Sequence, residues 1–267
     1  MKMGSGACRQ IGSQNRHPNG PRGQSAIISV PMKPPPSRRS LAMNLTFYRV
    51  VRIACRFITF QCLREVVLHP ERADRPGGLL LACTHVSHLE PIVVSSVLHR
   101  NVRWMSRIEF YRRWLGAAML RLGGAFPVDR FGFTLPAVRR GIQLVRGGEL
   151  VGVFPEGGVA TGRKSMLRGG PMKHGVCTIA IWAGTPIVPV VILGTQKLNR
   201  VGPWLPFRRG RVYVAFGREV TPPSRRSGAG RSSRENRQIL ADRLRAEFET
   251  TYRELLSHTG LQESDLP

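Results

Sequence analysis

The sequence predicts an α/β fold in which a largely parallel mixed sheet is flanked by helices on both faces. Short apolar runs alternate with amphipathic segments between residues 78 and 216, as in chains that connect parallel strands through helices. The apolar runs are nearly continuous, which is typical of strands buried on both faces. A length of 267 residues allows one substantial domain with extensions.

Two segments precede the alternating pattern. Residues 1–43 contain seven basic and no acidic side chains, so we expect a disordered basic arm. Helical periodicity then runs from Asn44 to about Leu68, and we assign residues 44–75 to an N-terminal amphipathic membrane-associated helix. The four arginines between residues 44 and 68 disfavour a bilayer-spanning helix, because each costs about 2.5 to 3.5 kcal/mol at the bilayer centre. The segment either lies in the membrane interface, which we favour, or packs on its own domain.

The elements beyond Pro76 follow from the same patterns. Residues 78–84, 102–106, 124–128, 149–154, 186–193 and 211–216 are the predicted strands, and 107–122, 133–146 and 173–183 are predicted helices, with one more beginning near Pro91. Pro189 lacks a backbone donor, so we expect its strand to lie at an edge or to carry a bulge. Residues 221–234 form a predicted linker, and residues 235–267 form a C-terminal helix and tail with one apolar stripe.

The chain is strongly basic, with 41 Lys and Arg against 16 Asp and Glu and a net charge of +25. Residues 44–219 alone carry 26 basic and 9 acidic side chains, so the excess lies in the folded part as well as in the arm. Such a surface attracts nucleic acid or an anionic membrane, although a codon bias toward arginine would produce the same composition. We find no recognised nucleic-acid-binding module, and the aromatic residues are not interleaved with the arginines.

The five cysteines are widely spaced and include no CxxC pair. This pattern supports neither a disulfide framework nor a zinc site, so no metal is expected and the compartment is predicted to be reducing. Residues 1–40 lack the apolar core of a secretory signal.

The strongest functional candidate is the pair His85 and Glu90, at a predicted strand-to-helix corner. Open α/β sheets bind ligands at such corners. A carboxylate five positions after a histidine can hold the imidazole in one tautomer, which suits a general base. Cys83 lies two residues before His85 and raises the alternative of a Cys-His nucleophile, which we rank lower because the surrounding strand is apolar.

Other predicted strands also end in residues suited to substrate binding. Glu156 is followed by the pair Gly157 and Gly158, whose backbone amides can approach a phosphate or a developing oxyanion closely. Arg130 follows another strand, and its guanidinium can bind a phosphate through two hydrogen bonds. These strand ends suggest one site for a phosphorylated substrate.

In this order the motifs resemble the glycerolipid acyltransferase family typified by 1-acylglycerol-3-phosphate acyltransferase. The four matching blocks are Thr84, His85, Ser87 and Glu90; Gly124 and Arg130; Phe154 to Gly157; and Val188 with Pro189. Lys173 and Gly175 fit a further Lys-x-Gly pattern of the family. The resemblance covers about residues 45–216, and it identifies residues 76–220 as the acyltransferase domain.

The resemblance implies an O-acyltransferase of lipid metabolism that transfers an acyl chain from a thioester, on coenzyme A or acyl carrier protein, to a lysophospholipid hydroxyl. It implies His85 as general base, Glu90 as its orienting partner, and substrate binding by Arg130, Glu156, Gly157, Gly158 and Lys173. Phospholipid biosynthesis, with phosphatidic acid as product, is the expected role. The expected location is the cytoplasmic face of a membrane, and no cofactor or nucleic-acid partner is expected.

Two departures from the family pattern bear on specificity. Glu90 stands where the family usually has aspartate, and its longer side chain can still reach the imidazole. Gly158, Val159 and Ala160 replace the family's Thr-Arg-Ser, which removes an arginine used on the acceptor phosphate. An acceptor other than 1-acylglycerol-3-phosphate is therefore the first alternative, and a basic nucleic-acid-binding protein is the second. A hydrolase that uses His85 to activate water is a third.

Overall fold

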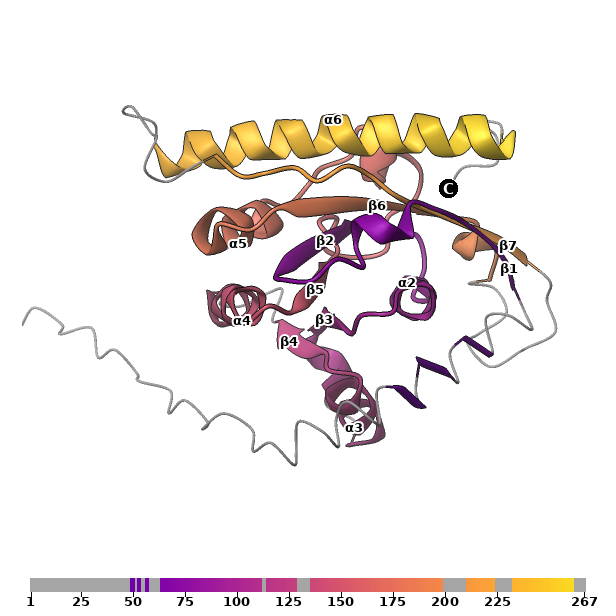
Figure 1. Ribbon diagram of the computed structural model, residues 1–267, viewed down its shortest axis with the longest axis horizontal. Coiled ribbons are helices and arrows are strands. Elements are labelled where there is room, and N and C mark those ends of the chain that lie inside the picture. Colours follow the sequence, from indigo (N-terminus) through magenta and orange to yellow (C-terminus); the bar gives the residue numbers. More distant parts are fainter. Residues whose placement is uncertain are drawn as a thin grey trace, which may run out of the picture. The chain divides into compact units, whose positions relative to one another are not determined.

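A computed structural model describes residues 49–50, 52–53, 56–57, 63–111, 114–128, 135–198, 210–223 and 232–261 (Figure 1). The predicted arm, residues 1–43, and most of the predicted linker, residues 221–234, lie outside the described residues. All the described residues belong to one compact unit, residues 37–267.

In the part of the chain that the structure describes, seven strands form one mixed sheet in the order β1-β7-β6-β2-β5-β3-β4. Only the neighbours β6 and β7 are antiparallel, and the other neighbouring pairs are parallel. The predicted largely parallel mixed sheet is therefore confirmed. The strands are β1 (Leu63–Leu68), β2 (Leu79–Cys83), β3 (Val102–Arg107), β4 (Phe126–Val128), β5 (Leu150–Val153), β6 (Ile187–Leu193) and β7 (Gly210–Phe216).

Helices cover both faces of the sheet, as predicted (Figure 1). The main helices are α2 (Glu90–Val97), α3 (Trp114–Leu122), α4 (Leu135–Arg146), α5 (Gly175–Ala183) and α6 (Ser233–Thr259), and short 3₁₀ turns include residues 70–72, 108–111, 162–164, 166–168 and 195–198. Strand β2 shows why its sequence is continuously apolar, because all five of its residues are buried. Leu80 and Ala82 pack toward α4, α5 and α6, whereas Leu79, Leu81 and Cys83 pack toward α2.

The predicted helix over residues 44–75 is wrong for its last part, because Leu63–Leu68 form strand β1 and Pro70–Arg72 form a 3₁₀ turn. The strand pairs in parallel with β7. Val66 and Leu68 pack on one face of the sheet and Val67 on the other, which is the two-residue alternation of a strand. Strand pairing has overridden the helical spacing of the arginines. The sheet thus begins before residue 76, the predicted start of the domain.

The strand that contains Pro189 is not at an edge, because β6 lies between β7 and β2. The alternative expectation, a bulge, fits the register. Val190 is opposite Phe216 and Ile187 is opposite Val220, so two residues on one side face three on the other. Pro189 accepts a hydrogen bond from Gly217 at 2.8 Å within this bulge. The bulge lets a proline sit in an interior strand without breaking the sheet.

Helix α6 begins and ends with recognisable caps. The hydroxyl of Ser232 accepts a hydrogen bond from the N–H of Glu235 at 3.1 Å. Gly260, with φ of 65°, ends the helix in the left-handed conformation. These caps place the helix at residues 233–259, so it begins two residues before its predicted start at residue 235.

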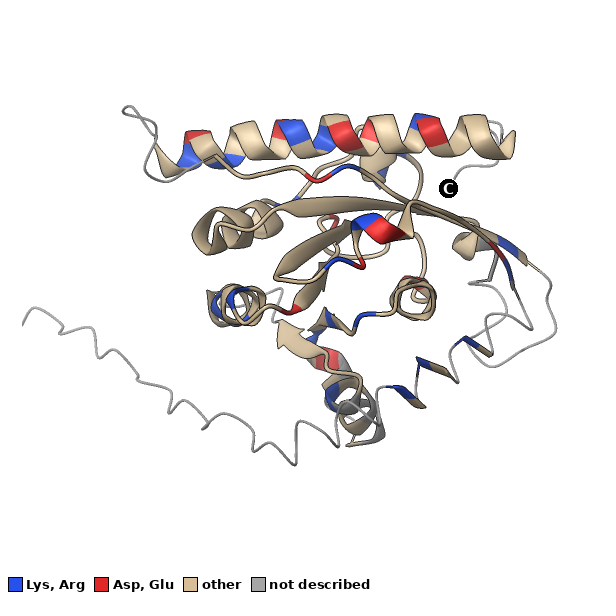
Figure 2. Cartoon of the chain, in the orientation of Figure 1, with Lys and Arg blue, Asp and Glu red and all other residues tan. Residues whose placement is uncertain are grey.

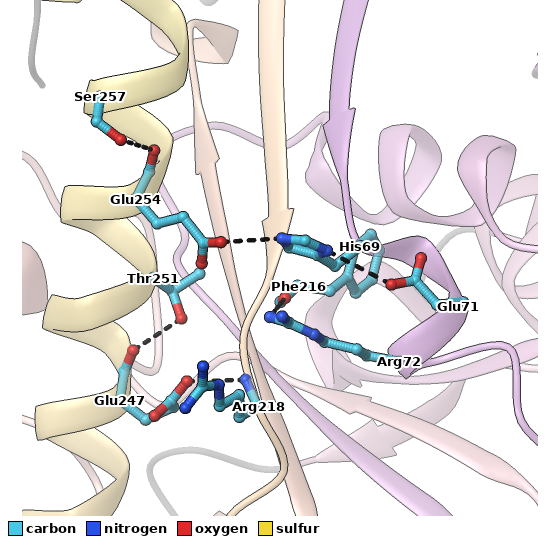
Figure 3. A network of polar contacts seen from close by, with 9 residues as sticks. All are labelled: His69, Glu71, Arg72, Phe216, Arg218, Glu247, Thr251, Glu254 and Ser257. Atoms are coloured by element: carbon cyan, nitrogen blue, oxygen red, sulfur yellow. Dashed lines mark hydrogen bonds and ion pairs between the residues drawn. The ribbon is translucent and has the colours of Figure 1, made fainter.

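Polar contacts attach α6 beside its buried apolar stripe (Figure 3). His69 donates from Nε2 to Glu254 at 2.9 Å, and its Nδ1 lies 3.4 Å from Glu71. Glu247 accepts a hydrogen bond from the N–H of Arg218 at 2.8 Å. The helix is thereby connected to the ends of both β1 and β7.

We expect acidification to weaken the attachment of α6. The hydrogen bond from His69 is the main cause that lowers the pKa of Glu254 below its ordinary value of 4.5. A carboxyl whose pKa is lower in the folded than in the unfolded chain stabilises the fold above its ordinary pKa, and this contribution is lost as the pH falls through the lowered value. Glu254→Gln should therefore flatten the fall in unfolding free energy below pH 4.5, measured by urea denaturation across that range.

The control for this prediction is Glu249→Gln, which removes a carboxylate from the same helix where it pairs with Arg253. The two variants are compared with the unaltered chain at each pH. Equal flattening in both would show that the loss of any acidic charge on α6 is enough, and it would contradict a specific role for the His69 contact.

Charged residues are distributed unevenly over the described elements (Figure 2). Helix α6 carries both signs, whereas the described part of residues 49–57 is helical and carries Arg49, Arg52 and Arg56 with no acidic side chain. Its Val50, Ile53 and Phe57 are 58%, 63% and 64% exposed. Among the described residues, no helix is both long enough and apolar enough to cross a bilayer.

Candidate active site

The predicted pair lies at the carboxyl end of β2. His85 Nδ1 is 3.0 Å from Glu90 Oε2, and Glu90, the first residue of α2, is fully buried. A carboxylate can only accept, so Nδ1 carries the proton and Nε2 is left as the basic nitrogen. In the described part of the chain no group hydrogen-bonds to Nε2. The imidazole is therefore held in the tautomer that a general base requires.

Aromatic stacking fixes the plane of the His85 ring. Phe154 stacks on it at a centroid distance of 4.1 Å, and Trp104 stacks on Phe154 at 5.1 Å. Trp104 also donates from Nε1 to Ser95 at 3.0 Å. Gly152 makes room for the indole, since a Cβ atom there would lie 2.5 Å from the ring. The position of the imidazole is therefore fixed by residues of β3 and of the end of β5 as well as by β2, which His85 follows.

Glu156 holds the backbone around His85. Its Oε2 accepts from the N–H of His85 at 2.7 Å, and its Oε1 accepts from the N–H of Met166 at 2.8 Å. Burial raises the pKa of Glu156, while the two backbone donors oppose the rise. Both oxygens are thus used within the protein, and Glu156 does not line the neighbouring cavity. The contact of Glu156 with the acceptor stays a prediction; in this structure its carboxylate joins three segments of the site.

Gly157 and Gly158 differ in what their amides can do. Gly157 has φ of 73°, and its N–H donates to Phe154 O at 3.0 Å, so this amide is used within a turn. The N–H of Gly158 donates to no acceptor in the described residues, and Gly158 lines the cavity. Of the two predicted oxyanion donors, only the Gly158 amide is available.

Lys173 lies against the same turn. Its N–H donates to Pro155 O at 2.8 Å, and a Cβ atom on Gly157 would lie 2.6 Å from its Nζ. The side chain is exposed and lines the cavity. Lys173 thus brings a positive charge beside the Gly157 turn. Arg130, the other predicted cationic ligand, lies outside the described residues.

A cavity of about 550 Å³ opens beside His85, within the range of small-molecule sites. Most of its wall is apolar and extends to α4 and α5, where Ala137, Val138, Val176 and Ile179 line it. Among the described residues, Arg52, Arg107 and Lys173 bring positive charge to its wall. The site therefore combines an apolar chamber, positive charge and one oriented imidazole.

The Cys-His alternative is not supported by the surroundings of Cys83. Burial, and then the charge of Glu90, raise the pKa of the Cys83 thiol well above its ordinary value. A buried thiol of this kind stays protonated and is a poor nucleophile. Among the described residues, no group of three or more His, Cys, Asp or Glu side chains is arranged to hold a metal ion.

Sequence reasoning missed two side chains of the site. Thr195 donates to Glu90 Oε1 at 2.5 Å, and Ser165 lies 3.4 Å from Glu156 Oε1. Ser165 precedes a short 3₁₀ turn and carries no sequence signal of its own. Thr195 follows a buried strand that pairs in parallel with β2, so the strand order, once it is known, points to Thr195 as a neighbour of the His85 site.

Residues 65–193 match the family model described as Acyltransferase. This part of the chain is an acyltransferase domain. The match confirms the predicted family. Together with the names of the similar proteins below, it also confirms the predicted enzyme class, an O-acyltransferase.

Similar proteins carry more specific names. The chain is 28% identical over 153 residues to the 1-acyl-sn-glycerol-3-phosphate acyltransferase of Bacillus subtilis (strain 168). The aligned residues cover 57% of this chain and 71% of that protein. It is 27% identical over 175 residues to the probable 1-acyl-sn-glycerol-3-phosphate acyltransferase of Mycoplasma pneumoniae, which covers 63% and 61%.

The fold of the acyltransferase domain has a counterpart among solved structures. The 1-acyl-sn-glycerophosphate (LPA) acyltransferase PlsC from Thermotoga maritima matches with a TM-score of 0.59 at 19% identity, over 85% of each chain. At this identity the match supports the mixed α/β fold alone.

Proposed function

We propose that the acyltransferase domain transfers an acyl chain from a thioester, on coenzyme A or acyl carrier protein, to the free hydroxyl of 1-acylglycerol-3-phosphate and so makes phosphatidic acid in phospholipid biosynthesis. The observation that carries the proposal is the His85 and Glu90 pair beside an apolar cavity with cationic residues. The names of the similar proteins support this acceptor. No metal or cofactor takes part in the proposed reaction.

The proposed chemistry begins at His85 Nε2. This nitrogen takes the proton of the acceptor hydroxyl as the oxygen attacks the thioester carbonyl, and Glu90 stabilises the imidazolium that forms. The N–H of Gly158 donates to the oxyanion of the tetrahedral intermediate. As the C–S bond breaks, the imidazolium returns the proton to the departing thiolate. No acyl-enzyme is formed, and the His85 and Glu90 side chains end in the protonation states in which they began.

The acceptor phosphate needs a cation, because this chain has Gly158, Val159 and Ala160 where the family has Thr-Arg-Ser. Lys173 supplies one beside the Gly157 turn. Arg130 supplies a second in the proposal, from its position after β4 in the sequence. The acyl chain of the donor then occupies the apolar chamber toward α4 and α5.

The test measures acyl transfer from two labelled donors, acyl-CoA and acylated acyl carrier protein. The acceptors are 1-acylglycerol-3-phosphate, other lysophospholipids and a neutral alcohol. Labelled phosphatidic acid is the expected product. Acylation of another acceptor alone would overturn the proposed acceptor and retain the acyl transfer. Release of free fatty acid alone would indicate a hydrolase.

We further propose that the enzyme works on the cytoplasmic face of an anionic membrane. In support, the described part of residues 49–57 combines arginines with exposed Val50, Ile53 and Phe57. Arg52 donates to the carbonyl of His99 at 2.6 Å and lines the cavity, so this segment lies next to the site. An interfacial position would bring the cavity close to its lipid substrates.

Replacing Val50, Ile53 and Phe57 together by Ser should weaken binding to anionic vesicles by at least about tenfold, because each apolar side chain contributes about 1.5 to 3 kcal/mol when fully buried in an apolar phase. Vesicle co-sedimentation measures the change. Trp182→Ser is the matched control, since Trp182 is 50% exposed at the end of α5. Unchanged sedimentation of the triple variant would contradict the interfacial segment.

A further inference from the structure

We propose that Thr195 is a positioning residue of the reaction, because its hydroxyl holds the buried Glu90 carboxylate in the orientation that fixes the tautomer of His85. The inference rests on the proposed role of His85 as general base. Thr195 has no counterpart among the site residues that the sequence predicted, and it acts only through Glu90.

The first argument is the burial of the carboxylate. Glu90 has no exposed surface, and each of its oxygens has one partner: Oε2 meets His85 Nδ1 at 3.0 Å and Oε1 meets Thr195 Oγ1 at 2.5 Å. Thr195 is also fully buried. A buried charged oxygen without a donor is costly, and a hydrogen bond to a charged oxygen is short and strong. Thr195 therefore supplies the donor that the second oxygen needs.

The second argument is that the local structure places Thr195 where it meets Glu90. Gly194 has φ of 90°, and a Cβ atom there would lie 2.2 Å from the carbonyl oxygen of Arg211, so only glycine fits this turn after β6. The N–H of Gly194 donates to Gln196 Oε1 at 2.9 Å, which closes the turn. The residue after Gly194 is thus directed to the edge of the sheet where α2 begins.

The third argument is the connection between the ends of β2 and β6. The hydroxyl of Thr84 accepts from the N–H of Ile192 at 2.9 Å and lies 3.3 Å from its carbonyl oxygen. Thr84 immediately precedes His85, and Ile192 lies three residues before Thr195. The two strand ends that carry His85 and Thr195 are thereby fixed relative to each other, with Glu90 between them.

The consequence of losing the Thr195 hydroxyl follows from the groups around the pair. Among the described residues these are the buried Cys83 thiol, the His88 ring at 6.0 Å from His85, and Glu156, whose carboxylate binds the backbone of His85. They are unchanged in a Thr195→Val variant. Glu90 Oε1 then lacks a donor, so the carboxylate attracts protons more strongly and stabilises the imidazolium of His85. The pKa of the His85 and Glu90 pair rises.

The test compares Thr195→Val and Thr195→Ser. We expect Thr195→Val to lower kcat about 10- to 100-fold with little change in KM, because Glu90 no longer holds the imidazole in the orientation needed for proton transfer. This is the range produced by losing a hydrogen bond to a charged group. The acidic limb of its kcat/KM profile should move to higher pH, and Thr195→Ser should restore both values. Thr251→Val, which removes another buried threonine hydroxyl, on α6, is the control and should leave the profile unchanged.

A second measurement separates this inference from the proposed function. Titration of the His85 ring carbons by NMR reports its pKa without any substrate, and Thr195→Val should raise this pKa. An unchanged His85 pKa and pH profile would overturn the role of Thr195 even if acyl transfer is present. An altered pKa in an enzyme without acyl transfer would retain the Thr195 contact and overturn the proposed function instead.

Discussion

His85→Ala should reduce acyl transfer by about 10²- to 10⁴-fold, the contribution of a positioned general base. The methyl group of alanine leaves the acceptor hydroxyl without a proton acceptor, whereas the cavity and its cationic residues are retained. Binding of the acceptor should therefore change much less than kcat. The measurement is the rate of labelled phosphatidic acid formation at saturating donor, with the variant beside the unaltered enzyme.

The matched control is His258→Ala, which removes an exposed histidine from α6. It should retain full activity. Thermal unfolding of both variants shows whether they remain folded. Activity of His85→Ala within a factor of about two of the unaltered enzyme would remove the general base from the mechanism, since such a factor is far below the expected range.

The sequence predicted the central elements well because their causes are local. Strand β2 is continuously apolar and ends before His85, and the two strands β5 and β6 show the same pattern. Helix α6 carries one apolar stripe and the Ser232 cap. In each of these elements, the residues that decide the structure are neighbours in the sequence or recur at a fixed period.

The differences between the prediction and the structure have non-local causes. Leu63–Leu68 became a strand because β7, more than 140 residues further along the chain, pairs with it. The family resemblance implies that Glu156 binds substrate, and in the structure its carboxylate accepts from the backbone N–H groups of His85 and Met166. The motif thus led to the candidate site without showing which groups of the protein its side chains bind.

Thr195 shows most clearly which kind of contact could not be predicted from the sequence. It lies 105 residues from Glu90, and the two meet only because β6 is the neighbour of β2 in the sheet. Strand order is not determined by alternating strand and helix patterns alone. Once the order is known, the carboxyl ends of β2, β5 and β6 fall at one edge, and the residues after them become candidates together.

Ala137→Phe should shift the enzyme toward shorter acyl donors. Ala137 is 5% exposed in the first turn of α4 and lines the apolar cavity. A phenyl ring there would occupy the space of about four methylenes of a long acyl chain, each contributing about 0.8 kcal/mol when buried. We therefore expect kcat/KM for a long-chain acyl-CoA to fall by about 10²-fold, while that for a short-chain donor changes little. Rates over a series of acyl-CoA lengths measure the shift.

Two further variants decide whether this shift arises in the cavity. Val176→Phe adds the same ring from α5, on another part of the cavity wall, and should also favour shorter donors. Ala246→Phe adds it on the exposed surface of α6 and should leave the length preference unchanged. Both cavity variants must melt near the temperature of the unaltered enzyme, because overpacking costs about 1 to 3 kcal/mol. An equal loss for all donor lengths in a folded cavity variant would show that the acyl chain lies elsewhere.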